Sequence, residues 1–339
     1  MKIDKRLIEI GDTSLLENLL IKASKQGFAE IFLCVEEELE FIEKLSVKYD
    51  AKILVDTIKN SGPISGLTEG LKNIRSDWAL AVSCDMPFFE FEVVETLLNE
   101  VGNYAVVMFE QQPLAAFYHK SMAEKFSKAL DEGNRKLRNI IEQVPHKILK
   151  PTFENSFFNV NTPADLKLAR GRVINLERKI PIISIVAPSS GTGKTTFIEK
   201  LIPKLNEFGI RVGVVKSDSH GFNLDVEGKD SWRFSQAGAR SVAVVSPKGW
   251  LMIQQTETRA DFSQIADKME DLDLILTESR TQGTTPAISL YRGIAEPLIN
   301  TSIVAVFTDR LIAVEDILQF DLNDIEQALK ICLFLMGRE

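Results

Sequence analysis

The amino-acid sequence predicts an α/β protein built from two domains, and three observations support this prediction. Short apolar runs of strand length alternate with amphipathic stretches of helix length along almost the whole chain. Continuous apolar strands separated by helices are typical of a mostly parallel sheet covered on both faces. The pattern restarts near residue 180 after a charged break at residues 177–179, and 339 residues are enough for about two domains. We therefore expect one domain over residues 1–172 and a second over residues 179–339.

In the first half, each expected element has a local signal. Thr13 or Ser14 can cap a helix whose leucines repeat at helical spacing, and Gly27 can end that helix. A loop rich in Gly and Pro at residues 60–66 leads into a further helix. The other elements expected in this half are a strand at 31–35, a helix at 36–48, strands at 52–55 and 78–83, and a last helix at 164–175.

In the second half, the same alternation begins with a β-branched strand at residues 180–187 and a helix at 197–208. The next strand covers residues 210–215, and a helix at 322–336 closes the chain. The Leu, Ile and Ala spacing of this last helix suits a dimer interface and an internal core equally well.

Composition and charge exclude several classes of protein. The longest apolar runs are of strand length, far below the ~20 residues that a bilayer span requires. The net charge of -8 is spread along the chain, so neither nucleic acid nor an anionic membrane is an expected partner. Three widely spaced cysteines exclude a disulfide framework and a Cys-rich zinc site. Charged residues without a following apolar stretch open the chain, which favours a cytoplasmic protein.

The strongest motif is a glycine-bearing loop between the strand at 180–187 and the helix at 197–208. It reads Pro-Ser-Ser-Gly-Thr-Gly-Lys-Thr-Thr and fits a Walker A loop, except that Pro188 replaces the first glycine of G-x-x-x-x-G-K-S/T. Glycines let backbone N–H groups turn toward a phosphate, and the helix N-terminus adds a positive dipole end. The alternative is a chance glycine loop before a capped helix. The candidate nucleotide-binding residues are Ser190, Gly191, Thr192, Gly193, Lys194, Thr195 and Thr196.

Within this loop, two side chains have expected roles toward a nucleotide. Lys194 would reach the β- and γ-phosphates, and the Thr195 hydroxyl would be a Mg²⁺ ligand.

Further segments of the second half extend this motif into a longer pattern. Lys216 ends the next strand and precedes His220, an Asp-x-x-Gly-Lys-Asp-Ser run contains Lys229 and Asp230, and Glu278 ends an apolar strand. Taken together, residues 180–310 resemble the molybdopterin-guanine dinucleotide biosynthesis adaptor proteins of the MobB type, which are small P-loop proteins that bind GTP. The resemblance implies roles at the GTP site for these five residues.

Two departures from the MobB pattern and two plainer interpretations accompany this resemblance. Ser217 stands where the family's first histidine is usual, and Ser279-Arg280 replaces Gly-Phe after Glu278. Glu278 could hold a metal-bound water, or it could be a surface carboxylate at a strand end. His220 could equally be an ordinary loop histidine.

Three separated features of the first half also suggest a ligand site. Asp56 ends a strand before the loop containing Gly62, Asp85 follows a buried strand within Cys-Asp-Met-Pro, and Asn159 and Asn161 belong to Asn-Val-Asn-Thr-Pro-Ala-Asp. Carboxylates at the C-terminal edge of parallel strands are where α/β enzymes hold ligands, and a single Asp there suits Mg²⁺. The plainer alternatives are that Asp85 caps the following helix and that Thr-Pro simply starts one.

These features, with Met-x-x-Asp-Lys at residues 1–5, Pro-Leu-Ala-Ala-Phe-Tyr at 113–118 and Gly-Asn-Arg-Lys-Leu-Arg at 133–138, resemble the molybdenum-cofactor guanylyltransferases of the MobA type. The resemblance covers residues 1–170 and implies a Rossmann-like nucleotidyltransferase domain followed by the P-loop NTPase domain. It implies transfer of GMP from GTP to molybdopterin, with release of pyrophosphate and with Mg²⁺ as cofactor. Cys34 departs from the asparagine expected at its strand end.

The MobA resemblance also implies residue roles. Asp85 would hold Mg²⁺ and be catalytic, Lys5 would be catalytic and offset phosphate charge, and Asp56 and Gly62 would contact the nucleotide. The remaining implied contacts are with the pterin, through Asn159 and Asn161.

The family's first strand and glycine-rich loop would precede Met1, so we expect the natural protein to begin about 15–20 residues upstream and its first strand to be missing from this chain. A missing central strand would expose the edges of both neighbouring strands.

Three readings of function remain open from the sequence. In the first, the chain makes molybdopterin-guanine dinucleotide, and its P-loop domain binds GTP, with molybdoenzymes or their chaperones as further partners and a dimer formed through that domain. In the second, another small-molecule nucleotidyltransferase is fused to a P-loop kinase. In the third, the first domain is inactive and the chain is a GTP-binding adaptor.

Overall fold

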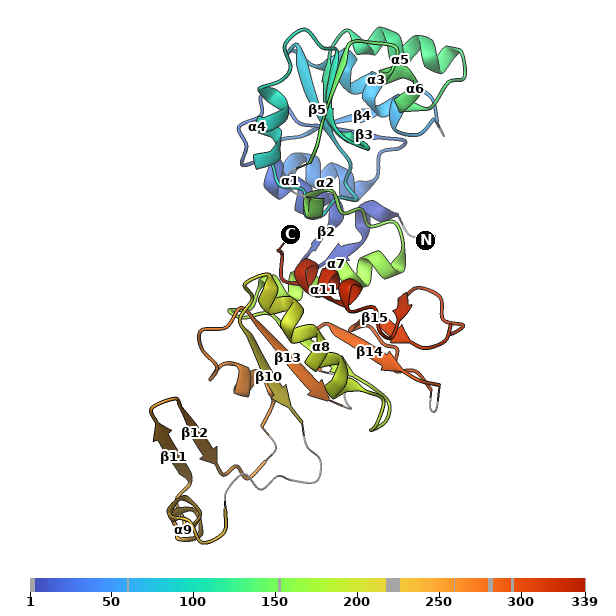
Figure 1. Ribbon diagram of the computed structural model, residues 1–339. Coiled ribbons are helices and arrows are strands. Elements are labelled where there is room, and N and C mark those ends of the chain that lie inside the picture. The colour runs from blue at the N-terminus through green and yellow to red at the C-terminus, as the bar shows by residue number, and fades with distance from the viewer. Residues whose placement is uncertain are drawn as a thin grey trace. The chain divides into compact units, whose positions relative to one another are not determined.

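The computed structural model describes residues 4–59, 61–151, 154–217, 226–258, 260–279, 283–293 and 296–338. Two compact units make up the chain: Met1–Val173 with Gly337–Glu339, and Ile174–Met336 (Figure 1). No helix of the described residues is long and apolar enough to cross a membrane.

The first unit contains short strands interspersed with helices. Its elements before the central sheet are η1 (Lys5–Leu7), β1 (Glu9–Ile10), β2 (Thr13–Ser14), α1 (Leu15–Ala23), β3 (Phe32–Val35), α2 (Glu40–Lys48), β4 (Lys52–Val55) and α3 (Pro63–Asn73). Those that follow are β5 (Trp78–Val82), α4 (Glu92–Leu98), β6 (Val106–Phe109), β7 (Gln112–His119), α5 (Met122–Asp131), α6 (Leu137–Ile141), β8 (His146–Leu149), η2 (Glu154–Phe157) and α7 (Pro163–Leu176).

In the first unit, helix α1 begins as the sequence predicts, whereas α2 and α3 begin at other residues than expected. Ser14 caps α1 as expected, because its hydroxyl accepts a hydrogen bond from Glu17 N at 3.2 Å. Helix α2 begins at Glu40, four residues later than expected. The loop expected at residues 60–66 is already helical from Pro63, because Gly62 adopts a positive φ of 66° and proline is favoured in the first turn.

The main sheet of the first unit is mostly parallel in strand direction, as expected, because β5, β6 and β8 point the same way and only β7 is reversed. The sheet order is β5-β7-β6-β8, and β7 runs antiparallel to both β5 and β6, whereas β6 and β8 are parallel. The reversal arises at a tight hairpin in which Phe109 pairs with Gln112 and Gln111 has a φ of 63°. Strands β3 and β4 form a separate parallel pair.

Helices cover both faces of the four-stranded sheet. One face buries Val106, Met108, Ala116 and Tyr118 against α3, α5 and α6. The other buries Val107, Phe109, Ala115 and Phe117 against side chains that include those of α4. Because successive strand residues point to opposite faces, β6 and β7 serve two cores at once.

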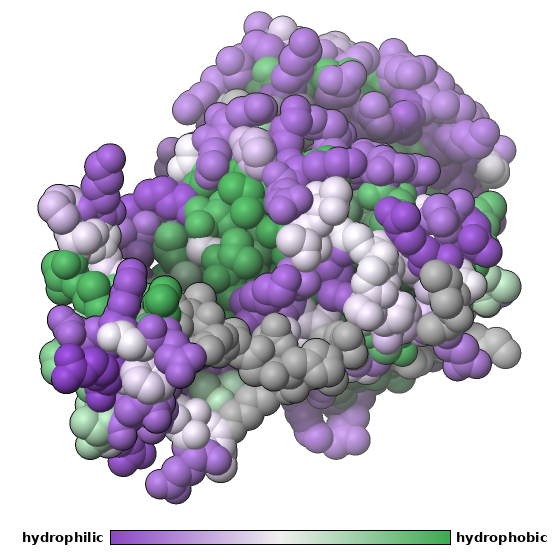
Figure 2. Space-filling view, turned by 60° about the horizontal axis from the view of Figure 1, so that its bottom comes forward, coloured by the Kyte–Doolittle hydropathy of each residue, from purple (hydrophilic) through white to green (hydrophobic). Residues whose placement is uncertain are grey.

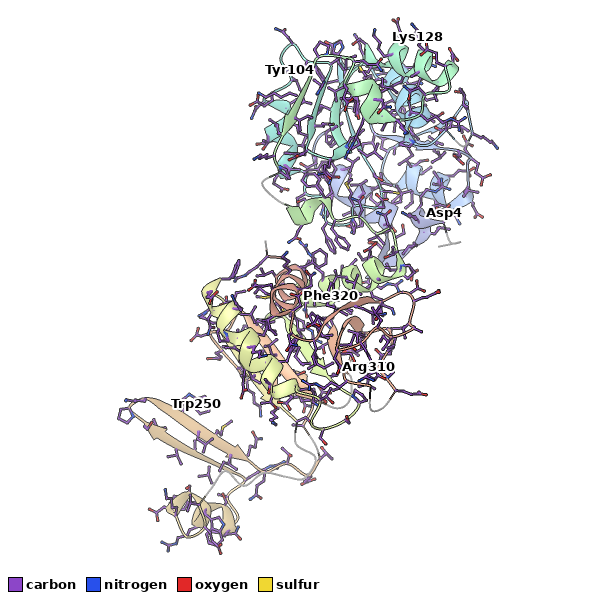
Figure 3. The ribbon with its side chains drawn as sticks, turned by 45° about the vertical axis from the view of Figure 1, so that its right-hand side comes forward. Asp4, Tyr104, Lys128, Trp250, Arg310 and Phe320 are labelled. Carbon is purple, nitrogen blue, oxygen red and sulfur yellow. The ribbon has the colours of Figure 1, made fainter. Side chains whose placement is uncertain are left out.

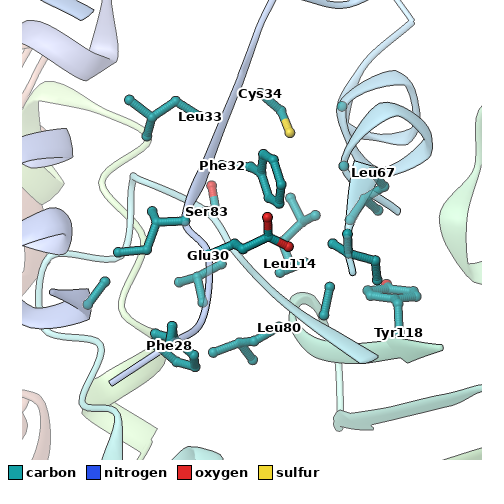
Figure 4. A pocket seen from close by; sticks show the side chains of 18 of the residues that line it. Phe28, Glu30, Phe32, Leu33, Cys34, Leu67, Leu80, Ser83, Leu114 and Tyr118 are labelled. Carbon is teal, nitrogen blue, oxygen red and sulfur yellow. The ribbon is translucent and has the colours of Figure 1, made fainter. Parts of the chain in front are cut away.

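A groove of about 470 Å³ lies between β3 and β5. All of β3 and β5 line it, together with residues from α1, α3 and β7. Figure 4 shows its largely apolar lining, in which Phe32 and Leu33 come from β3 and Leu80 from β5. Among the described residues, β3 pairs only with β4 and β5 pairs only with β7, so neither strand bonds to the other across the groove.

The second unit is a fully parallel sheet with an added hairpin. Its elements are β9 (Ile182–Val186), α8 (Lys194–Glu207), β10 (Val212–Lys216), α9 (Asp230–Gln236), β11 (Ser241–Ser246), β12 (Gly249–Gln254), α10 (Phe262–Ala266), β13 (Leu274–Ser279), β14 (Ala287–Tyr291), β15 (Ile303–Thr308), β16 (Leu318–Asp321) and α11 (Ile325–Leu335). The six-stranded sheet has the order β10-β13-β9-β14-β15-β16.

Helix α11 belongs to the core of this unit. Its side chains from Ile331 to Leu335 are buried, and it packs beside α8. The internal-core alternative for the C-terminal helix is therefore confirmed.

Outside the parallel sheet, α9 and the antiparallel hairpin β11–β12 form what we call the arm (residues 230–254). The arm exposes large hydrophobic side chains: Phe234, Val244, Val245, Trp250, Leu251 and Met252. Trp250 is labelled in Figure 3, and Figure 2, which brings the lower end of Figure 1 toward the viewer, shows hydrophobic atoms exposed among hydrophilic ones.

Candidate nucleotide-binding and active sites

The P-loop joins β9 to α8. Gly191 and Gly193 have φ values of 75° and 101°, and the left-handed conformation of Gly193 at the N-cap lets the loop turn directly into the helix. Lys194 is buried, and its Nζ donates to Ser189 O at 3.0 Å. Thr192 Oγ1 also donates to Ser189 O, at 2.9 Å. Two side chains of the loop therefore bond to its own backbone at Ser189, the segment that would surround a phosphate.

Three polar side chains meet beside this loop. Lys216 and Glu278 are opposite each other in the β10–β13 register, and Lys216 Nζ lies 3.4 Å from Glu278 Oε2. Thr195 Oγ1 donates to both oxygens of Glu278, at 3.1 and 3.0 Å. Glu278 therefore contacts the P-loop hydroxyl. A hydroxyl and a carboxylate this close together can both be oxygen ligands of Mg²⁺, which prefers such ligands.

The other candidates of the second unit are not in this cluster. Asp230 is the first residue of α9 and lies 3.6 Å from Arg233, while Lys229 is the helix N-cap. Neither residue hydrogen-bonds or ion-pairs with a described P-loop residue. His220 lies outside the described residues.

In the first unit, a cluster forms where β5 ends. Lys5 Nζ donates to Asn161 Oδ1 at 2.6 Å and lies 3.5 Å from Asp85 Oδ2. Ser83 Oγ donates to Asp85 Oδ1 at 2.6 Å. The backbone N–H of Val160 donates to Asp85 O at 2.8 Å, which joins the two loops. The structure thus brings Lys5, Asp85 and Asn161 together from distant parts of the chain, and Ser83 was not among the sequence candidates.

The plainer alternatives for these loops have different outcomes. Helix α4 starts only at Glu92, and the Asp85 carboxylate bonds to Ser83 instead of capping that helix. Thr162, by contrast, does start a helix: its hydroxyl accepts from Asp165 N at 3.1 Å. Asn159 lies in the same loop, and its Nδ2 donates to Phe157 O at 2.9 Å.

Asp56 lines the groove between β3 and β5, and so does Ser83, which bonds to Asp85. Oδ1 of Asp56 is buried and has no hydrogen-bond partner in the described part of the chain. Burial, reinforced by the charges of Glu36 and Glu69, raises the pKa of Asp56 to about 6. Gly66 of α3 approaches so closely that a Cβ there would lie 2.9 Å from Cys34 Cβ and 3.5 Å from Asp56 Oδ1.

The described residues contain no group of three or more His, Cys, Asp or Glu side chains placed to hold a metal ion. A cation at Asp85 or at Thr195 and Glu278 would therefore need ligands from a bound phosphate or from water.

The fold and these clusters define the class: a nucleotidyltransferase domain joined to a P-loop nucleotide-binding domain. Residues 1–148 match the family described as MobA-like NTP transferase domain, and residues 182–309 match the family described as Molybdopterin guanine dinucleotide synthesis protein B. The first part of the chain belongs to the MobA-like family and the second part to the MobB family, so both predicted resemblances are confirmed.

The second part of the chain is similar to the molybdopterin-guanine dinucleotide biosynthesis adapter protein of Haemophilus influenzae, with 35% identity over 161 residues, 46% of this chain and 89% of the relative. The first is similar to a probable molybdenum cofactor guanylyltransferase of Clostridium perfringens, with 31% identity over 174 residues, 47% of this chain and 84% of the relative. A solved structure of molybdopterin-guanine dinucleotide biosynthesis protein A from Archaeoglobus fulgidus has 28% identity and a TM-score of 0.44, and covers 50% of this chain and 90% of that chain.

Proposed function

We propose that this chain makes molybdopterin-guanine dinucleotide in the cytoplasm. Its first unit transfers GMP from GTP to molybdopterin and releases pyrophosphate, and its second unit binds GTP through the P-loop. The observation that carries the proposal is the cluster of Lys5, Asp85 and Asn161 at the carboxyl end of β5, in a chain whose two parts belong to the two families of this pathway.

The reaction needs no covalent intermediate with the protein. A terminal phosphate oxygen of molybdopterin attacks the α-phosphorus of GTP, and the bond from that phosphorus to the pyrophosphate oxygen breaks. Catalysis then consists of holding two anionic groups in line and offsetting their charge. Lys5, whose ammonium group is partly exposed beside Asp85, supplies the positive charge.

Asp85 fits a Mg²⁺ ligand by its bonding. Its Oδ1 accepts from Ser83, which fixes the carboxylate, whereas Oδ2 has only the long 3.5 Å contact with Lys5 and keeps lone pairs for a cation. Mg²⁺ bound there would neutralise charge on the α-phosphate and the leaving pyrophosphate. Asp56 and Gly62 would contact the nucleotide, and Asn159 and Asn161 the pterin.

In the second unit, the P-loop residues Ser190 to Thr196 would surround the phosphates of GTP. Lys194 would leave Ser189 O and turn to the β- and γ-phosphates. Thr195 and Glu278, already in contact, would hold Mg²⁺ directly or through water. Lys216 is close enough to Glu278 to fix its orientation. We also propose roles at this site for Lys229, Asp230 and His220. The only support for these three residues is their match to the MobB sequence pattern.

We further propose that the P-loop unit forms a dimer through the arm. An isolated two-stranded hairpin is marginally stable in water, yet β11–β12 exposes Val245 and Trp250 at 81% and 68%. Covering these apolar side chains with the arm of a second copy would stabilise both hairpins. Molybdoenzymes or their chaperones remain proposed recipients of the product.

The test of the proposed function is pyrophosphate release by the full chain supplied with GTP, Mg²⁺ and molybdopterin. Asp85→Ala should abolish release while GTP binding at the P-loop persists, and Lys194→Ala should abolish that binding while release continues. Asp77→Ala, which removes an exposed carboxylate paired with Lys120, is the matched control and should change neither. Undiminished release by Asp85→Ala would refute the metal role. No release by the unsubstituted chain, with GTP binding lost in Lys194→Ala, would favour the adaptor reading.

A further inference from the structure

We propose that Arg292 binds the terminal phosphate of the nucleotide in the P-loop. It would do so from the side of the loop opposite to Glu278. This inference rests on the proposed GTP binding by the second unit and names a phosphate-binding residue that lies outside the P-loop motif.

The sheet topology places Arg292 beside the loop. Strand β14 is the parallel neighbour of β9, and Ser289 is opposite Val186 in their register. Arg292 lies three residues beyond Ser289, just as Ser189 of the P-loop lies three residues beyond Val186. The segments that follow β9 and β14 therefore leave the sheet at the same edge, after the same number of residues.

Arg292 approaches the loop at Gly193, the residue before the P-loop lysine Lys194. A Cβ built on Gly193 would lie 3.3 Å from Arg292 Nη2 and 3.9 Å from its Cζ and Nε. A side chain at position 193 would push the guanidinium away by a few tenths of an ångström, so glycine lets Arg292 approach the loop this closely. Since Lys194 follows directly, two cationic side chains flank the same turn of the loop.

The two sides of the loop differ in charge. In the sheet, β13 and β14 are the two neighbours of β9, so Glu278 and Arg292 approach the P-loop from opposite sides. On the β13 side, Thr195 and Glu278 are placed to hold a cation. A terminal phosphate between them would face a metal ion on one side and the guanidinium fork on the other.

Of the three cations Lys216, Arg292 and Arg310 beside the loop, Arg292 is the one without an ion pair to a described carboxylate. Lys216 is paired with Glu278 at 3.4 Å. Arg310, which is labelled in Figure 3 and follows β15, is paired with Asp309 at 3.1 Å. Arg292 is exposed, and no described carboxylate pairs with it. An exposed guanidinium beside a phosphate-binding loop is suited to bidentate binding of a phosphate.

The test uses the full chain and measures dissociation constants for a non-hydrolysable GTP analogue and for GDP. Because the transferase unit also binds GTP, the part of the binding that is lost in Lys194→Ala defines the P-loop site. Arg292→Ala should weaken the analogue at that site by about 10-fold or more and leave GDP within about 2-fold, and Arg292→Lys should fall between. Arg240→Ala, an exposed arginine of the arm region, is the matched control and should change neither affinity.

The outcomes separate this inference from the proposed function. If Lys194→Ala loses binding but Arg292→Ala binds the analogue as tightly as the unsubstituted chain, the role of Arg292 is refuted and the P-loop function stands. Equal losses for the analogue and GDP refute contact with the terminal phosphate. Full binding by Lys194→Ala refutes both proposals. Thermal unfolding of Arg292→Ala should match that of the unsubstituted chain, because the side chain is exposed.

Discussion

Replacing Asp56 by Asn is expected to stabilise the first unit at neutral pH. Asp56 has a buried oxygen without a described hydrogen-bond partner, and its pKa is raised to about 6 by burial and by Glu36 and Glu69. A raised pKa means that the folded state prefers the neutral acid. The stabilising contribution of this group is therefore full below the ordinary value of 3.8 and is lost as the pH rises through about 6.

The size of the effect follows from the shift. A difference of about two units, at 1.36 kcal/mol each, sets a ceiling of about 3 kcal/mol on the free energy of unfolding. Asp56 is only half-buried, so solvent screening reduces this to about 1 kcal/mol. For a unit of this size, such a change raises the melting temperature by about 2–4 °C.

Scanning calorimetry without nucleotide, from pH 4 to pH 8, measures this difference. The gain of Asp56→Asn should grow as the pH rises from 4 to 7 and vanish at pH 4. Asp4→Asn is a control of opposite sign, since the hydrogen bonds from Arg6 lower the pKa of Asp4 and its contribution is lost only as the pH falls below 3.8. A gain for Asp56→Asn that is independent of pH, or a loss at pH 8, would refute the reasoning.

Two further changes act on the second unit. Gly213→Ala would place a Cβ 2.4 Å from Leu272 Cδ1 and 2.8 Å from Met269 Cε, so the ends of these two side chains must shift and this unit should lose about 1 kcal/mol in denaturant titration; an unchanged or increased stability would contradict the packing. Joint substitution of Val245 and Trp250 by Ser should convert a dimer to a monomer in sedimentation velocity; a monomeric unsubstituted chain would contradict the dimer proposal.

Local sequence signals were sufficient for the P-loop. Its glycines, lysine and threonine are adjacent in the chain, so the motif itself determines the turn into α8. The same holds for α1, which Ser14 caps as expected. The resemblances also predicted the two families, because their motifs recur in the same order along each half.

Contacts between distant residues were harder to predict. Lys5 hydrogen-bonds to Asn161, which lies 156 positions later in the sequence, and no local pattern predicts that contact. The same holds for the hydrogen bond from Ser83 to Asp85. The reversal of β7 depends on a two-residue turn at Gln111, a residue that rarely adopts a positive φ. Arg292 carries no motif, and only the pairing of β14 with β9 brings it to the P-loop.

The groove between β3 and β5 has a consequence for how the first unit handles other polypeptide chains. Each strand presents a row of backbone donors and acceptors that no described strand satisfies, above an apolar floor. An extended segment entering between them would bond to both edges and merge the pair β4-β3 and the set β5-β7-β6-β8 into one seven-stranded sheet. By mass action, whatever peptide filled it would raise the melting temperature of the unit in proportion to the logarithm of its concentration. The groove between β3 and β5 is therefore the place where the first unit has room and backbone partners for one added strand.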